Sequence, residues 1–334
     1  MDSLTQIVLG ASVAEVALGK KIGNKAILWG AIAGTIPDLD VIAKLFTDIV
    51  TANEIHRGFS HSILFCLLAS PLLGWLARKI HSKLDVSWKE WTNMMFWALV
   101  THPMLDAHTT WGTQLFWPLD IKVSYQNIFV ADPLYTVPFL ACVATAMFSK
   151  RTNPKRASIN RLGIILSTSY MIVTLGLKGY TYFKFEDSLK AQNIDYNEIS
   201  NRATPLNSLL WTANIDADST YLIGYYSILD KSDDIHFSRF NKNRNDYKKL
   251  MDEPLVKRLI KLCKGWYLIQ KTETGYSFID MRFGKMSIDE TIPDFVFRYD
   301  LTYENGALKA SQKQPEMKNI RGMFSSLWNR IKGI

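Results

Sequence analysis

Long apolar segments, separated by short basic ones, constrain the fold of this chain more than any other feature. Residues 61–80, 132–148 and 160–182 are each apolar enough and long enough to cross a bilayer. Three further helices are predicted over residues 4–18, 24–36 and 88–110. The first two are short for spanning, but they are rich in Gly and Ala and so could pack closely inside a bundle. We therefore expect a mainly α, multi-pass membrane helix bundle over residues 1–184.

The placement of Lys and Arg predicts the orientation of this bundle. Basic residues gather in alternate connections, at 20–25, 78–89 and 150–161. Cytoplasmic loops carry such an excess, so the segments 37–60 and 110–130 and everything after residue 182 are predicted to lie outside the cytoplasmic membrane. The net charge of +8 is explained by these loops. We expect the lipid bilayer to be a partner and nucleic acid not to be one.

The composition changes near residue 185. Tyr, Ile and Phe alternate or gather in the segments 219–229, 265–269, 275–282 and 294–303, with turn signals at 273–275 and 304–306. This pattern predicts a soluble antiparallel β (α+β) domain over residues 185–316, on the extracytoplasmic side. Residues 317–334 form an amphipathic basic tail, either at the membrane interface or packed on its own β domain.

Polar residues that can bind metals or support metal ligands gather in the first 132 positions. Most lie in or beside apolar segments, and the predicted topology places all of them at the outer ends of helices. Residues that only cap helices would have been divided between both ends. One or two divalent metals explain this convergence, and the ligand types predict zinc, with manganese and iron as alternatives. The residues are Asp2, Gln6, Asp38, Asp40, His56, His61, His102, Asp106 and Asp132.

Each motif also has a simpler interpretation. His102 and Asp106 are four residues apart, so they share one helix face and could form only a structural hydrogen bond. Asp2 and Asp132 stand where N-caps are expected. The acidic pair at 38–40 is typical of an Asp-rich turn.

The segment 56–62 also has a simpler interpretation, because taken alone it is typical of a surface loop. In that segment Ser60 is expected to cap the next helix, which would place His61 in its first turn.

Several motifs, in order, resemble the YdjM/YfhP-type family of bacterial inner-membrane metal-dependent hydrolases. The similarity implies a multi-pass membrane protein with a hydrolase site, and relatives commonly carry His where Gln6 stands here. The matching stretches are MDSLTQ (1–6), GAIAGTIPDLD (30–40), HRGFSHS (56–62), THPMLDAHTTWGTQLFWP (101–118), DPLYT (132–136), RATPLNSLLW (202–211) and DMRFG (280–284).

The predicted function is a metal-dependent hydrolase at the outer face of the cytoplasmic membrane. A lipid-like or lipid-linked substrate, such as a phosphoester, is expected because the site opens at headgroup depth. Catalytic roles fall to Asp38 and Asp106, which help to activate water, and to Arg57 and His108, which could bind an anion or stabilise charge. The predicted direct ligands are Asp38, Asp40, His56, His61, His102 and Asp106, with Asp2, Gln6 and Asp132 as supporting or additional ligands.

Two other functions use the same residues. A metal or proton transporter could employ them as a permeation site. A non-catalytic assembly or sensor protein could hold a structural metal, while its β domain binds a protein partner that the sequence does not identify.

Overall fold

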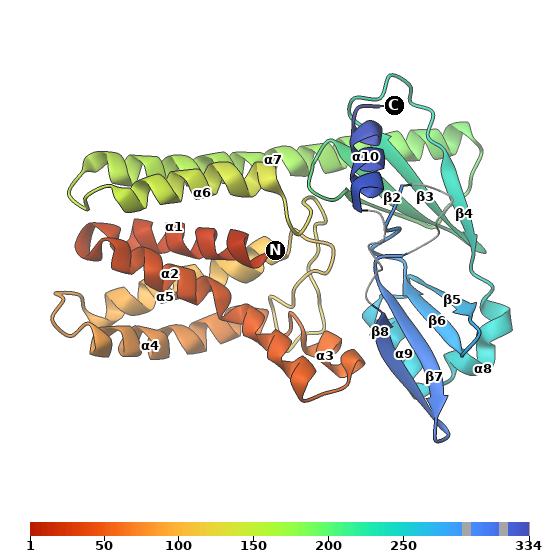
Figure 1. Cartoon of the computed structure of the whole chain (residues 1–334), viewed down its shortest axis with the longest axis horizontal. Helices are drawn as coiled ribbons and strands as arrows, with labels where there is room; N and C mark the ends of the chain where they lie inside the picture. The colour runs from red at the N-terminus through yellow and green to blue at the C-terminus, as the bar shows by residue number, and fades with distance from the viewer. Residues whose placement is uncertain (289–294, 314–319, 334) are drawn as a thin grey trace. The chain divides into compact units, whose positions relative to one another are not determined.

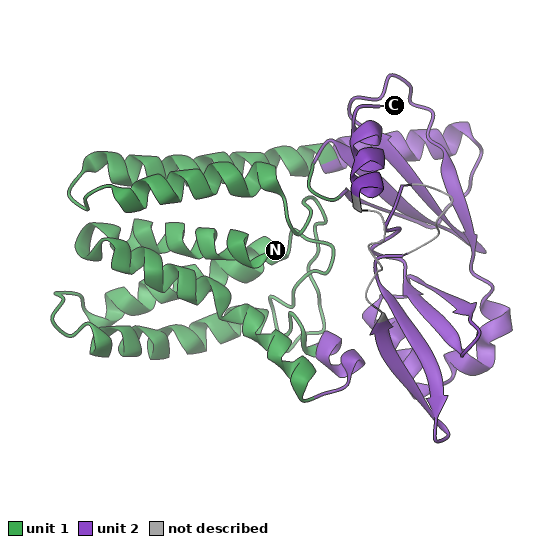
Figure 2. Cartoon of the chain, viewed as in Figure 1, with its two compact units in different colours: residues 1–46, 55–177, 205–207 green, residues 47–54, 178–204, 208–334 purple. Residues whose placement is uncertain are grey.

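The computed structural model describes residues 1–288, 295–313 and 320–333. The chain forms two compact units (Figure 2). The first, helical unit comprises residues 1–46, 55–177 and 205–207. The second unit comprises residues 47–54, 178–204 and 208–334.

The helical unit contains every helix that the sequence predicts before residue 185 (Figure 1). Two short three-ten helices, η1 and η2, were not predicted. The last helix, α7, is longer than predicted and continues into the second unit. The elements are α1 (Ser3–Ile22), α2 (Asn24–Thr35), η1 (Pro37–Leu45), η2 (Phe59–His61), α4 (Ile63–Ile80), α5 (Trp88–Asp106), α6 (Pro133–Phe148) and α7 (Pro154–Ala191).

Local capping explains where several of these helices begin. Asp2 caps α1 by accepting a hydrogen bond from the Thr5 amide, and Asp132 caps α6 through the Leu134 amide. The prediction that Ser60 caps α4 is wrong, because Ser62 accepts the hydrogen bond from the Phe65 amide at 3.0 Å. The Ser60 hydroxyl donates to Asp40 instead, so His61 lies in η2, before α4.

Helices α1 and α2 pack with their backbones in close contact. A Cβ atom built on Gly30 would lie 2.2 Å from the carbonyl oxygen of Gly10, so neither position has room for a side chain. Helix α1 also contacts α7 through a buried ion pair, in which both Nε and Nη2 of Arg156 donate to Glu15 at 2.6 Å.

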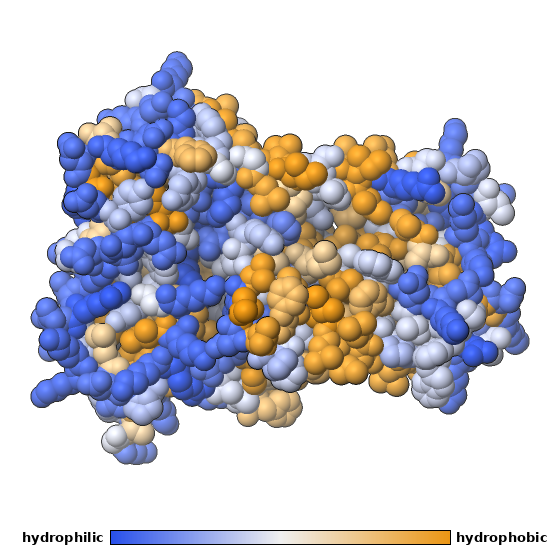
Figure 3. Space-filling view, turned by 180° about the vertical axis from the view of Figure 1, so that it is seen from behind, coloured by the Kyte–Doolittle hydropathy of each residue, from blue (hydrophilic) through white to orange (hydrophobic). Residues whose placement is uncertain are grey.

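Within the described part of the chain, two helices, α4 and α7, are long and apolar enough to cross a membrane. A third span results if α2 and η1, bent by 44° at their junction, count as one, while α6 is apolar but shorter. Hydrophobic side chains gather over the surface of the helical unit (Figure 3). Length and composition do not fix how many of these helices cross the membrane, so the number of crossings stays a prediction.

The helical unit has two chemically different ends. The turn between α1 and α2 and the connections α4–α5 and α6–α7 lie together at one end (Figure 1), and hydrophilic side chains cover that end (Figure 3). The N-terminus, the last turn of α5 and the first turn of α6 lie at the other end. The basic connections and the candidate site residues are thus separated by the length of the helices.

The second unit contains two four-stranded antiparallel sheets, in the orders β1-β2-β3-β4 and β5-β6-β7-β8. This agrees with the predicted antiparallel β region, although β1, β2, β4 and β8 and the short helices were not predicted. Asp294 and residues 317–319, which belong to predicted segments, lie outside the described residues. The elements are α3 (Ile49–Ile55), β1 (Glu198–Ala203), β2 (Leu210–Ala217), β3 (Thr220–Ser227), β4 (Phe237–Asn241), η3 (Arg244–Tyr247), α8 (Lys248–Met251), α9 (Pro254–Leu262), β5 (Tyr267–Lys271), β6 (Tyr276–Asp280), β7 (Arg298–Glu304), β8 (Ala307–Lys313) and α10 (Ile320–Ile331).

The C-terminal helix α10 is attached to the first sheet by its last turn. Arg330 forms hydrogen bonds of 2.5 and 2.7 Å to the carboxylate of Asp230. The Ser227 hydroxyl donates to the Ile331 carbonyl at 2.5 Å. Phe324 and Trp328 remain exposed. Of the two predicted arrangements, these contacts support packing of the tail on its own β domain.

Candidate metal centre

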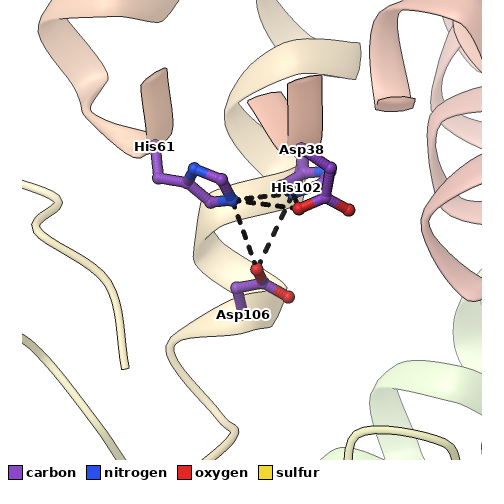
Figure 4. Close-up of side chains that lie close together, drawn as sticks. All are labelled: Asp38, His61, His102 and Asp106. Carbon is purple, nitrogen blue, oxygen red and sulfur yellow. Dashed lines mark hydrogen bonds and ion pairs between the residues drawn. The ribbon is translucent and has the colours of Figure 1, made fainter. Parts of the chain in front are cut away.

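Four side chains that are distant in the sequence converge at one end of the helical unit (Figure 4). Asp38 comes from η1, His61 from η2, and His102 and Asp106 from consecutive turns of α5. One ligand atom from each residue lies within 4.8 Å of the ligand atoms of the others. The side chains of His61, His102 and Asp106 are fully buried, whereas that of Asp38 is 26% exposed.

The separations within this group suit a small tetrahedral ion. Nε2 of His61 and Nε2 of His102 are 3.2 Å apart, and Oδ1 of Asp38 lies 3.3 and 3.4 Å from them. Oδ2 of Asp106 lies 3.5 and 3.7 Å from the same two nitrogens. Tetrahedral zinc, with bonds of about 2.0–2.2 Å, has ligand atoms about 3.3–3.5 Å apart. Two carboxylates would also balance the charge of a divalent cation.

In each of the two imidazoles, Nδ1 faces away from the four-residue group and has polar contacts of its own. Nδ1 of His102 lies 2.6 Å from the Gly34 carbonyl oxygen. Nδ1 of His61 lies 3.0 Å from the Ser60 hydroxyl and 3.3 Å from Oδ2 of Asp40. Both Nε2 atoms are thereby turned toward the group. Hydrogen bonds of this kind fix the ring orientation of metal-ligating histidines.

Asp106 receives support from three sides. Gln6 donates to Oδ1 at 2.9 Å, Nε of Arg57 lies 3.0 Å from Oδ2, and the Met1 amine contacts Oδ1. Among the described residues, Oδ2 of Asp106 and Oε1 of Gln6 are buried and accept no hydrogen bond. A cation bound by the four-residue group would give Oδ2 of Asp106 a direct partner in addition to its ion pair with Arg57.

The electrostatics of the group favour positive charge. Burial lowers the pKa of His61, but its hydrogen bonds to the Asp106, Asp38 and Asp40 carboxylates outweigh burial and raise the pKa to about 9. His61 therefore carries a proton at neutral pH when no metal is present, and a metal must displace it to bind Nε2.

Other predicted ligands lie outside the four-residue group. Asp40 accepts hydrogen bonds from His56 Nδ1 and from the Arg57 amide, each at 2.9 Å. Asp40 thus connects His56 to His61 from behind the group, and burial lowers the pKa of His56. Asp2 and Asp132 are helix caps, and Asp132 also accepts from the Tyr170 hydroxyl at 2.8 Å.

The two predicted charge-stabilising residues differ in position. Arg57 contacts Asp106 and also donates to the Thr109 hydroxyl at 2.6 Å. His108 instead lies 2.8 Å from Asn127 through Nδ1, and burial lowers its pKa. The position of His108 therefore gives no support to its predicted role.

Three contacts around the group, made by Gly34, Ser60 and Thr109, were not predicted from the sequence. The carbonyl of Gly34 is a backbone group, so no residue type announces its role. Ser60 adjoins His61 and could have been found as a hydrogen-bond partner within the HRGFSHS stretch. The contact of Thr109 could not have been found in this way, because its partner Arg57 lies far away in the sequence.

Apolar helices long enough to span a membrane, together with a buried group of two Asp and two His that could bind a metal, fit the class of membrane proteins with a possible metal-binding site. A family model described as YdjM inner membrane protein matches residues 1–184. The chain belongs to this family, as its motifs predicted. Neither the comparison with curated proteins nor that with solved structures gave a significant match.

Proposed function

We propose that the protein is a metal-dependent hydrolase of the cytoplasmic membrane, acting at the outer face on a lipid-like or lipid-linked substrate such as a phosphoester. The observation that carries this proposal is the convergence of Asp38, His61, His102 and Asp106, whose ligand atoms lie within 4.8 Å of one another. The family match over residues 1–184 supports the membrane location.

Zinc is the proposed metal, because imidazole and carboxylate ligands at this spacing suit it, with manganese and iron as alternatives. Its ligands would be Asp38, His61, His102 and Asp106. A tetrahedral zinc ion held by all four side chains has no open position, so hydrolysis requires Asp38 to yield its position to water or the ion to take a fifth ligand. The metal would then lower the pKa of that water molecule and so supply a nucleophile near neutral pH. Arg57 would hold Asp106 in place and balance its charge.

Asp38 would have a second role in this proposal. It is the one residue of the group whose side chain reaches solvent. A substrate must therefore approach from the side of Asp38. Its carboxylate can accept a proton from water there, as a general base does, once one of its oxygens is free.

The surroundings of the group favour a lipid-like substrate. Large apolar side chains are exposed along η1, which carries Asp38, and at the residue that follows it. Others are exposed in the segment 116–121, which follows α5. Exposed apolar surface of this extent marks contact with a membrane or an apolar ligand. A headgroup could reach Asp38 while its chains remain beside these residues, which are Leu39, Val41, Ile42, Leu45, Phe46, Phe116, Trp117, Leu119 and Ile121.

The topology of the site supports the outer face. The basic connections lie at the opposite end of the helical unit from the four-residue group (Figure 1). Because cytoplasmic loops attract Lys and Arg, the group is assigned to the extracytoplasmic end.

The test combines metal analysis with an assay of phosphate release. Purified protein in detergent is loaded with zinc or manganese and incubated with dihexanoyl phosphatidic acid and dihexanoyl phosphatidylcholine. Release of phosphate or of a phosphorylated headgroup that is lost in His102→Ala, but retained in Lys21→Gln, is the expected result. Lys21 is exposed and forms an ion pair with Glu90, away from the group.

Two results would reject the proposal. Absence of hydrolysis by the metal-loaded protein on every phosphoester of such a series would reject the substrate class. Metal-dependent ion uptake into proteoliposomes without hydrolysis would favour the transporter.

A further inference from the structure

The second unit contains a buried arginine that forms no ion pair with any described residue. Arg202, at the end of β1, is only 6% exposed. Its Nη1 makes no hydrogen bond to any described residue, and Nη2 makes one long contact, 3.4 Å from Oδ1 of Asn214. Burial lowers the pKa of Arg202 to about 10, so the guanidinium stays charged at neutral pH. A buried charge without a partner costs several kcal/mol unless a ligand satisfies it.

Two of the family-like stretches meet at this arginine. Arg202 begins RATPLNSLLW, and Gly284 ends DMRFG. A Cβ atom on Gly284 would lie 2.3 Å from Nη2 of Arg202, so a larger residue at 284 would displace the guanidinium from its position. Gly284 also has a φ of +71°, which glycine tolerates best. The amide of Asn214 donates to the Met281 carbonyl and connects the two sheets there.

Positive charge exceeds negative charge around Arg202. Lys178 interacts electrostatically with it and donates to the Asn201 carbonyl at 2.7 Å. Asp280 is the carboxylate that acts on Arg202, but it already accepts a 2.6 Å hydrogen bond from Arg282. Among the described residues, no carboxylate forms an ion pair with Lys178 or with Arg202, so these two side chains leave a local excess of two positive charges.

We propose that Arg202 anchors an oxyanion-binding site in the second unit, with a phosphoryl group as its ligand. A guanidinium presents paired N–H groups that match two oxygens of a phosphate. The excess of two positive charges matches a dianionic phosphate better than a carboxylate. Because Nη1 is out of contact with water, the ligand enters by local opening and binds slowly. This site is separate from the four-residue group and does not depend on the proposed hydrolase activity.

The experiment measures phosphate binding to the full chain in detergent by calorimetry. The protein is first treated with EDTA, so that no metal at Asp38, His61, His102 and Asp106 contributes. Inorganic phosphate and dihexanoyl phosphatidic acid are the two probes. The variants are Arg202→Lys, which keeps the charge but loses the paired donors, and Arg239→Lys as the matched control. Arg239 lies exposed on β4 of the same sheet.

We expect saturable binding of phosphate to the wild type and to R239K, and an affinity at least tenfold lower in R202K. Binding of inorganic phosphate alone identifies free phosphate as the ligand, and binding of both probes identifies a lipid headgroup. No saturable binding of either probe, or equal affinity in R202K, would overturn the proposal. If R202K does not fold, hydrogen exchange of the wild-type protein is measured with and without phosphate. The proposal expects phosphate to slow amide exchange at residues 202 and 281–284. Unchanged exchange at these residues would overturn it.

Discussion

Oδ2 of Asp40 lies 3.3 Å from Nδ1 of His61, on the opposite side of the imidazole from Nε2, which faces His102. Asp40 was predicted as a direct ligand, but this position suits a residue that orients one. The same carboxylate accepts from His56, so one acidic side chain holds both histidines of the HRGFSHS stretch.

Loss of either converging histidine should remove the metal. We expect His61→Ala and His102→Ala to contain at least tenfold less zinc than the wild type, since each supplies one of four ligand atoms. Metal content of detergent-purified protein measures this. His108→Ala is the matched control, because His108 pairs with Asn127 outside the group. Wild-type zinc content in both ligand variants would rule out this centre.

Asp40→Asn should weaken metal binding without abolishing it. An amide keeps the shape of the side chain but loses the charge that holds His61 Nδ1, and such changes cost about 10–100-fold in affinity. Competition with a chelator of known affinity gives the value. Asp85→Asn, at an exposed position of the α4–α5 connection at the opposite end of the helical unit, should bind as the wild type does. Equal affinities of Asp40→Asn and the wild type would show that Asp40 has no orienting role.

The buried pair of Glu15 and Arg156 should be needed for the stability of the helical unit. Both side chains are only 4% exposed, so Glu15→Gln leaves an uncompensated arginine, at a cost of about 3–5 kcal/mol. We expect a lower midpoint of thermal unfolding in detergent. The double variant Glu15→Leu/Arg156→Leu should recover much of the loss, because both charges are then absent. A double variant less stable than Glu15→Gln would contradict this explanation.

Labelling from outside intact cells tests the proposed orientation. In a variant without the native cysteines 66, 142 and 263, single cysteines are placed at 83, 155, 54 and 240. An impermeant thiol reagent should label 54 and 240 and leave 83 and 155 unlabelled, because the last two lie in basic connections. The reverse pattern would place the metal centre on the cytoplasmic side.

Helix α10 should detach when its ion pair is broken. Arg330 binds Asp230 and the Tyr225 carbonyl, so Arg330→Gln removes the ion pair of the last turn and leaves there the hydrogen bond from Ser227 to the Ile331 carbonyl. Faster hydrogen exchange over residues 320–331 is expected. Arg321→Gln, at an exposed position of the same helix, should leave exchange unchanged. If Arg330→Gln also exchanges at the wild-type rate, other contacts hold α10.

Much of the helical unit could be predicted from the sequence, because the relevant signals are local. Apolar length and the caps at Asp2 and Asp132 depend on residues within a few positions of one another, and they gave helices close to those observed. The cap at Ser60 failed because Ser62, two residues later, was equally suitable, and a tertiary contact with Asp40 decided between them.

The kind of chemistry follows from residue types alone: imidazoles and carboxylates stand at the ends of apolar helices, in motifs that resemble the YdjM family. Which of these side chains meet depends on the packing of the chain. It brought the ligand atoms of Asp38, His61, His102 and Asp106 within 4.8 Å of one another, and it placed Asp40 and His56 outside this group. It also placed Arg202 against Gly284 across two sheets. Residue type limits what a side chain can bind, whereas the packing of segments distant in sequence fixes the separations on which binding depends.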